Sequence, residues 1–321
     1  MNVSARILRC LRTEQSSAAE LGAKCGASLE TIRHEISELQ AAGFVFQQHP
    51  ILGYSLLSCP DRLIADDIAS RLASDWVKEI LVFEKTSSTN DRAMELGTAG
   101  GNGPSVVLAE TQSAGRGRFG RVWKSAPREG VWFSLIFRPK LPVEHWSRLP
   151  GAAALAVAHA LEEVGVGHVG VKWPNDLQIG SNKVAGILVE TGSQAKKGPF
   201  AVIGIGINAN QSKFPDDLAT KATSIKQVLG FAVDRNDLAS KLISNLQIAI
   251  QSTANKHPAM IQELRERSTL LGNPIRFETP TQKTTEGVAA DLDDEGRLIV
   301  QTQEGELRTL NAGEVSLSSF S

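Results

Sequence analysis

A short glycine- and arginine-rich stretch is the first feature of this sequence that could perform chemistry. Residues 114–123 read AGRGRFGRVW, so Arg116, Arg118 and Arg121 are separated by glycines and followed by Trp123. Glycine gives such a segment backbone freedom, and closely spaced guanidinium groups suit phosphate or carboxylate ligands. The stretch matches neither a Walker loop nor a dinucleotide fingerprint, and a solvated basic loop is the alternative. Its role therefore has to be judged together with the other polar segments.

Three further segments carry polar residues that a plain core would not need. Residues 86–90 (TSSTN) join a predicted strand to a predicted helix, where their side chains either cap the helix or meet on a polar ligand. Residues 172–176 (KWPND) close an apolar strand, and Lys172 there either reaches water from an edge strand or needs an anionic partner. Residues 183–190 (KVAGILVE) begin a strand with small residues, which let a ligand approach the backbone.

Together the four segments supply a set of cations that suits phosphate chemistry with a carboxylate substrate. Cations neutralise a polyphosphate and the charge that develops at the α-phosphorus. Magnesium, which prefers oxygen ligands and substrate phosphates, would complete the set, with Asp176 as a possible ligand. The sequence contains no competing Ser-His-Asp set or metal-binding His/Cys cluster. The candidate cations are Arg116, Arg118, Arg121, Lys172 and Lys183.

Length and composition indicate a globular protein of several domains. The 321 residues are enough for two or three domains, and the net charge of −1 means that any anion site is local. The cysteines Cys10, Cys25 and Cys59 are odd in number, without zinc-like spacing or a secretory leader, so we expect reduced thiols and a cytoplasmic location. No apolar run is long enough to span a bilayer, so we expect no membrane partner.

Residues 1–62 predict a winged helix-turn-helix domain. Ser17 and Glu20 form a capping-box pattern at the start of a second helix, and Ser28 is a predicted N-cap for a third. Two apolar stretches then flank a turn with Pro50 and Gly53, as in a two-stranded wing.

The third predicted helix is the candidate DNA-reading element. Thr31, Arg33 and His34 lie between its apolar positions and could face a major groove, with Ser28 at its start. Residues 1–60 contain five Lys or Arg and five Glu, whereas DNA binding normally uses a basic surface. A protein-contact surface or a regulatory remnant is therefore the alternative.

Residues 63–270 predict a central α+β domain, and residues 271–321 predict a small SH3-like β-barrel. In the central domain we expect a mixed, mostly antiparallel sheet with its helices on one face. After residue 270, short strands alternate with polar turns. The central elements are strands near 81–83, 106–108, 132–137, 169–173, 177–179, 183–190 and 201–207, and helices near 63–74, 152–164, 236–253 and 258–268.

Three separated motifs resemble those of the bifunctional biotin protein ligases that also repress the biotin operon. They are residues 115–121 (GRGRFGR), 172–176 and 183–190, and the resemblance spans all three predicted domains. It implies that the central domain is a class II synthetase-like biotin ligase domain, which joins biotin to ATP in the presence of Mg²⁺ to give biotinyl-5'-AMP. It also implies transfer of biotin to one lysine of the biotin carboxyl carrier domain of acetyl-CoA carboxylase.

The resemblance implies roles for individual residues. Arg116, Arg118 and Lys183 would be catalytic. The residues that would bind biotin are Ser88, Thr89, Asn90, Gln112, Arg116, Gly117, Arg118, Lys183 and Gly186. The residues that would bind ATP or the adenylate are Arg116, Arg121, Trp123, Lys172, Asn175, Asp176 and Asn208. Some repressor-type members have GRGRRGR in the loop, and Phe119 here replaces the middle arginine.

The resemblance also implies regulation. Biotinyl-AMP would promote a homodimer whose two N-terminal domains bind operator DNA of biotin biosynthesis genes. The alternatives are a biotin ligase with a vestigial winged helix, a lipoate-type ligase with the same central fold, and a non-enzymatic biotin-sensing repressor. The arginine loop and the pair Lys172 and Lys183 favour a biotin ligase. Gly313 and Glu314, in a C-terminal loop, are candidates for a contribution to acceptor and ATP handling.

Overall fold

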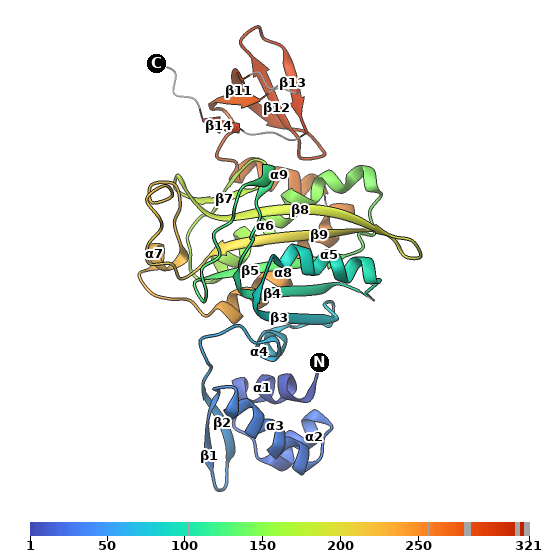
Figure 1. Ribbon diagram of the computed structural model, residues 1–321, viewed down its shortest axis with the longest axis vertical. Coiled ribbons are helices and arrows are strands. Elements are labelled where there is room, and N and C mark those ends of the chain that lie inside the picture. The colour runs from blue at the N-terminus through green and yellow to red at the C-terminus, as the bar shows by residue number, and fades with distance from the viewer. Residues whose placement is uncertain (102, 256, 279–283, 312–314, 318–321) are drawn as a thin grey trace.

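The computed structural model describes residues 1–101, 103–255, 257–278, 284–311 and 315–317, and three sheets follow one another along the chain (Figure 1). Gly313 and Glu314 lie outside these residues. None of the helices within them is both long and apolar enough to cross a bilayer.

The helices are α1 Val3–Thr13, α2 Ala18–Cys25, α3 Leu29–Ala41, α4 Ala65–Arg71, α5 Thr89–Ala99, α6 Leu149–Glu163, α7 Ile225–Leu229, α8 Arg235–Asn255 and α9 His257–Arg267. The strands are β1 Val45–His49, β2 Gly53–Ser58, β3 Glu79–Thr86, β4 Ser105–Gln112, β5 Gly130–Phe137, β6 Gly170–Lys172, β7 Asp176–Ile179, β8 Asn182–Gln194, β9 Gly198–Asn208, β10 Pro274–Glu278, β11 Thr284–Leu292, β12 Leu298–Thr302, β13 Leu307–Leu310 and β14 Val315–Leu317.

The N-terminal unit has the predicted order of three helices and a hairpin. Ser17 and Glu20 form both halves of the capping box at α2, and Gly26 ends that helix in the left-handed conformation. The Ser28 hydroxyl accepts the Thr31 N–H at the start of α3, which confirms the predicted cap. Apolar residues of the three helices form one core, and β1 pairs with β2 as an antiparallel hairpin.

The central sheet is mixed. Among the described residues its strands follow the order β3-β4-β5-β9-β8-β7-β6, and only the β3–β4 pair is parallel. The parallel pair follows from chain connection, because α5 carries the chain from the end of β3 back to the start of β4.

Helices cover both faces of this sheet, so the expectation of helices on one face is wrong. Alternate residues of a strand point to opposite faces. Val106 and Leu108 of β4 therefore belong to the core that includes α6 and α8, whereas Val107 packs on the other face with Ala93 of α5. Helix α5 covers only part of that second face, and the part beyond its N-terminus is where the candidate site lies (Figure 1).

Buried polar contacts attach the N-terminal unit to the central sheet. Glu110 of β4 and Arg235 of α8 form a pair 2.6 Å apart with both side chains 2% exposed. The same carboxylate accepts the backbone N–H of Leu63 at 2.6 Å, and Asn236 accepts that of Ile64 at 2.9 Å. Because a buried carboxylate is costly unless paired, this arrangement holds the connecting segment in one place.

One turn of the C-terminal sheet hydrogen-bonds to the segments on either side of the central helix α6. Glu295 accepts hydrogen bonds from Ser147 and Arg148, both at 3.1 Å. The indole N–H of Trp173 donates to the Gly296 carbonyl at 3.0 Å. Since Trp173 is part of the KWPND motif, this turn supports the segment that leads into the candidate site.

Candidate active site

A row of residues across five strands forms the floor of the site. The register pairs Lys172 with Asp176, Asp176 with Gly186, Gly186 with Gly206, and Gly206 with Trp132. Directly paired residues point to the same face of a sheet, so these five residues share one face. The two glycines in the middle leave a gap between the polar end of the row and Trp132.

The indole of Trp123 fills this gap. A Cβ atom at Gly206 would lie 2.4 Å from the Trp123 ring, and one at Gly186 would lie 2.9 Å from it. The ring also meets Trp132 edge-on, with centroids 6.4 Å apart. Its N–H is buried without a hydrogen-bond partner among the described residues, which leaves a donor available for a ligand.

Lys183 and Asp176 form the polar end of the floor. Lys183 Nζ lies 2.6 Å from Asp176 Oδ1 and 5.2 Å from the Trp123 ring centroid. Both side chains are about a third exposed or less, at 32% and 26%. The ammonium is therefore beside the gap, paired to one carboxylate and able to contact a second anion placed over the glycines.

The arginine-glycine loop lies across the site and contacts both sides of it. Arg116 pairs with Asp91 of α5 and with Glu190 of β8, and the hydrogen bond to Asp91 raises the pKa of its guanidinium above the ordinary value. On the other side, Arg118 donates to the Asn175 side chain at 3.2 Å. The loop thus bridges α5 and the segment before β7.

Phe119 occupies a strained position in this loop. Its φ is +55°, a left-handed conformation that is uncommon for a residue with a large side chain. The ring is 64% exposed, and the Arg118 guanidinium stacks over it at 4.9 Å from the centroid. Phe119 therefore contributes a surface for Arg118 rather than a cation of its own.

A hydrogen-bonded cluster closes the opposite end of the site. Gln112 Oε1 accepts the backbone N–H of Thr89 at 2.8 Å, and its amide donates to Ser125 at 2.8 Å. Ser134 Oγ lies 2.7 Å from Thr89 Oγ1 and 2.6 Å from Asn90 Oδ1. Ser88 holds the N-cap position of α5, but its side chain makes no capping hydrogen bond. The cluster therefore does more than cap the helix.

All fifteen predicted biotin- and nucleotide-site residues line one cleft of about 800 Å³, a volume typical of sites for small ligands. Of the described residues that line this cleft, nine are Lys or Arg and two are Asp or Glu, which favours a polyanionic ligand. The fifteen are Ser88, Thr89, Asn90, Gln112, Arg116, Gly117, Arg118, Arg121, Trp123, Lys172, Asn175, Asp176, Lys183, Gly186 and Asn208.

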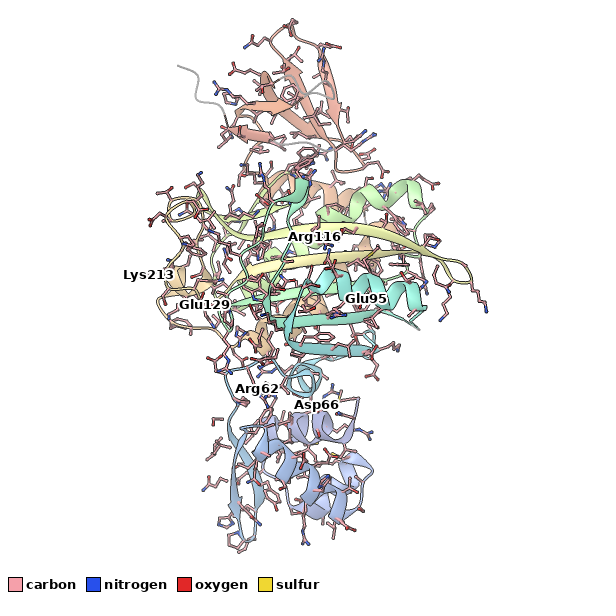
Figure 2. The ribbon with its side chains drawn as sticks, in the orientation of Figure 1. Arg62, Asp66, Glu95, Arg116, Glu129 and Lys213 are labelled. Atoms are coloured by element: carbon pink, nitrogen blue, oxygen red, sulfur yellow. The ribbon has the colours of Figure 1, made fainter. Side chains whose placement is uncertain are left out.

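The cleft also contains residues that the sequence analysis did not assign. Gly204 and Gly206 are two apart in a strand, so both face the cleft, and this spacing was the available signal. The chain after β9 forms a wall with Lys213 and Phe214, and Figure 2 shows Lys213 at the side of the central domain. Arg276 reaches the cleft from the C-terminal sheet, a contact between distant segments that no local pattern indicates.

The four predicted DNA-contacting residues lie outside this cleft, in α3. Arg33 and His34 are exposed, Ser28 is exposed at the helix start, and Thr31 is partly exposed. Ser28 and Thr31 also bond to each other through their hydroxyls at 2.9 Å, so part of their polar capacity serves the cap.

The fold and cleft define a protein with a cation-lined cleft, large enough for a small ligand, on one face of a mixed sheet. Residues 82–208 match the biotin/lipoate A/B protein ligase family, and residues 270–318 match the biotin protein ligase C terminal domain. The "Bifunctional ligase/repressor BirA" of Bacillus subtilis is 33% identical over 307 residues, covering 94% of this chain and 93% of the relative. The chain therefore belongs to the biotin/lipoate A/B protein ligase family, among its biotin protein ligases.

Two further comparisons agree with this family. The "Biotin--[acetyl-CoA-carboxylase] ligase" of Mycobacterium tuberculosis is 36% identical over 247 residues, covering 75% of this chain and 90% of the relative. The solved structure of the biotin protein ligase of Aquifex aeolicus in complex with biotin and ATP superposes with a TM-score of 0.65 at 28% identity. That match covers 75% of this chain and 99% of the Aquifex chain.

The glycine gap gives a direct prediction. In Gly206→Ala the new Cβ atom would overlap the Trp123 ring, so the ring has to leave the floor and enter solvent. Iodide quenching of tryptophan emission should then show one additional accessible tryptophan of the five in the chain. Gly167→Ala is the matched control, because a Cβ there meets nothing within 4 Å. Equal quenching in Gly206→Ala and the control would contradict this account of the floor.

Proposed function

We propose that this protein activates biotin with ATP to biotinyl-5'-AMP and then transfers biotin to a lysine of a carboxylase carrier domain. The observation that carries the proposal is the gap over Gly186 and Gly206, with Lys183 at its edge and the arginine loop across it. The ligase names of the relatives and the biotin and ATP in the Aquifex aeolicus complex support it.

The first step is an attack of the biotin carboxylate on the α-phosphorus of ATP, with pyrophosphate leaving. Two anions repel each other as they approach, so the protein has to supply positive charge at that point. Lys183 is placed to bridge the carboxylate and the α-phosphate, and Arg116 and Arg118 would neutralise charge from the loop side. No side chain acts as a nucleophile in this step, because the substrate carboxylate is the nucleophile.

The two ends of the cleft suit the two substrates. Thr89 and Gln112, at the end of the cleft opposite Lys183 and Asp176, would hydrogen-bond the ring head of biotin together with Ser88, and Gly117 and Gly186 would allow close approach of its chain. The side-chain oxygen of Asn90 already accepts a hydrogen bond from Ser134, and its amide nitrogen already donates one to Glu190. Asn90 would therefore support the residues at this end of the cleft. The nucleotide would lie toward the residues Arg121, Trp123, Lys172, Asn175, Asp176 and Asn208.

Magnesium would enter with the ATP phosphates. Within the described residues no group of three or more His, Cys, Asp or Glu could hold a metal ion by itself. Asp176 fits a single oxygen contact to an ion that keeps most of its bonds to phosphate and water, as magnesium does. Such an ion would neutralise charge on the phosphates.

In the second step the amine of the carrier lysine attacks the carbonyl carbon of the adenylate, and AMP leaves. A mixed anhydride hydrolyses in water, so the intermediate needs a cover until the carrier arrives. The arginine-glycine loop, whose side chains contact both α5 and the segment before β7, is placed to provide this cover.

The lipoate-type ligase and the non-enzymatic sensor are the competing interpretations of the same cleft. The Bacillus subtilis relative with a ligase/repressor name covers 94% of this chain, and Lys183 and the loop arginines are all in the cleft, which favours an active biotin ligase. A biotin-dependent exchange of pyrophosphate into ATP, compared with the same assay using lipoate, distinguishes the two ligases.

Lys183 provides the sharpest test of the ligase. Lys183→Ala should lower the rate of carrier-domain labelling with biotin, ATP and magnesium roughly 10²- to 10³-fold, the usual loss when one charge-stabilising group is removed. Lys196→Ala, an exposed lysine in the β8–β9 turn, is the control and should label at the normal rate. Equal rates for Lys183→Ala and the control would show that the catalytic assignment is wrong.

We also propose that residues 1–62 form a winged helix-turn-helix domain, residues 63–270 the ligase domain and residues 271–321 an SH3-like domain. The N-terminal unit would repress biotin biosynthesis genes when biotinyl-AMP promotes a homodimer. The ligase/repressor name of a relative that aligns with 94% of this chain supports the proposal, as does the exposure of Arg33 and His34 on α3. A ligand changes such an assembly only through its different affinity for the two states.

Sedimentation with and without biotinyl-AMP tests this regulation. We expect the mass to double over the micromolar range when the adenylate is bound, and the adenylate-bound dimer to bind promoter DNA of biotin genes. Arg33→Ala should weaken that DNA binding without changing the mass, because it removes an exposed cation from α3. An unchanged mass with the adenylate would contradict the proposal, and a dimer without promoter binding would favour a vestigial winged helix.

A further inference from the structure

A backbone carbonyl fixes the direction of the Asn208 amide. Asn208 is the last residue of β9 and lies two residues beyond Gly206, so both residues face the cleft side of the sheet. The Asn208 Nδ2 donates to the Thr223 carbonyl at 3.1 Å, and this hydrogen bond is buried. Because a carbonyl oxygen can only accept, the amide nitrogen of Asn208 has to face Thr223, and its Oδ1 is left to accept a hydrogen bond elsewhere.

Asn208 fixes the amide of Gln211 in turn. Gln211 Nε2 lies 3.4 Å from Asn208 Oδ1, and because Oδ1 is an acceptor, the nitrogen of the Gln211 amide has to face it. The backbone of Gln211 is held as well, since its carbonyl accepts the Ser224 hydroxyl at 2.7 Å and Ser224 is the N-cap of α7. The protein thus sets both the place of Gln211 and the direction of its side-chain amide.

This arrangement leaves the side-chain oxygen of Gln211 without a partner. Gln211 is 5% exposed, and its Oε1 accepts no hydrogen bond from any residue that the structure describes. A buried acceptor without a donor costs free energy and is rare in folded proteins. Gln211 lines the cleft in the wall that follows β9, at the side of the central domain where Figure 2 labels Lys213. A ligand that places a donor at this wall would satisfy the acceptor.

We propose that Gln211 is a specificity residue, which selects a purine nucleotide with an amino group on its base over one with a carbonyl oxygen at that position. This inference rests on the proposed function for the place of the nucleotide, toward Trp123 and Asn208. The amino group of adenine donates to Gln211 Oε1 and pairs it. Guanine and hypoxanthine present an oxygen there instead, so two acceptors face each other and the Gln211 oxygen stays unpaired.

Three nucleotides that differ at this one position of the base test the proposal. ATP carries the amino group, purine riboside triphosphate carries a hydrogen in its place, and ITP carries an oxygen. Titration calorimetry of the full-length protein with magnesium and biotinol, the alcohol analogue of biotin, measures their binding without turnover. We expect the wild type to bind ATP roughly five- to hundredfold more tightly than purine riboside triphosphate, and to bind ITP no better than purine riboside triphosphate.

Gln211→Met removes the acceptor and keeps the length of the side chain. It should lower the preference for ATP over purine riboside triphosphate roughly fivefold or more, and it should not lower the melting temperature, because it removes a buried unpaired oxygen. Gln227→Met is the matched control and should keep the wild-type preference. Gln227 accepts the Thr223 hydroxyl at 3.3 Å in the same wall, but it is exposed and is not among the described residues that line the cleft.

Equal preference for ATP in the wild type and Gln211→Met would overturn the proposal, as would an equal loss of preference in Gln227→Met. A wild type that binds ATP and purine riboside triphosphate equally would overturn it without any variant.

Biotin-dependent exchange of pyrophosphate into ATP separates this proposal from the ligase function. A preference that Gln211→Met removes, in a protein that shows no exchange, would support the role of Gln211 and count against the ligase assignment. Exchange by both proteins, with the same ratio of kcat/KM for ATP and purine riboside triphosphate, would refute the role of Gln211 alone.

Discussion

The rest of the site depends on the absence of two side chains from the middle of the central sheet. Gly186 and Gly206 face each other on neighbouring strands, and any Cβ there would occupy the space where the Trp123 ring now lies. These two glycines let a ligand approach the backbone of β8 and β9, with Asp176 and its partner Lys183 on one side of them and Trp132 on the other. The helices on the opposite face make this possible, because α6 and α8 supply the core that these strands lack on the open face.

Several cations of the cleft are paired with carboxylates of the protein itself. Lys183 is paired with Asp176, and Arg116 is paired with Asp91 and Glu190, so several cations that suit phosphate are neutralised by the protein. Both groups of side chains are partly exposed, where ion pairs contribute little and exchange partners readily. A polyanion can replace these carboxylates at small cost, while the buried Glu110 and Arg235 pair, which no ligand reaches, keeps its geometry.

The sequence predicts the motifs that line the site better than it predicts the helices and side chains that hold those motifs in place. The KWPND and KVAGILVE segments are local patterns, and the register brings Lys172, Asp176 and Gly186 into one row as strand pairing requires. The placement of α5 on the opposite face from α6 could not be read from its residues, because a face is defined only once the strands are paired. The pairing of Asp91 and Glu190 with Arg116 could not be read from the sequence either, because the two carboxylates lie 25 and 74 residues from Arg116 along the chain.

A crystal structure of the protein with biotinyl-5'-AMP tests the central claim most directly. We expect the adenylate to lie over Gly186 and Gly206, with its acyl-phosphate junction beside Lys183, Trp123 displaced from the gap, and Arg116 in contact with the ligand. An adenylate bound elsewhere, with Trp123 still seated on the two glycines, would contradict the account.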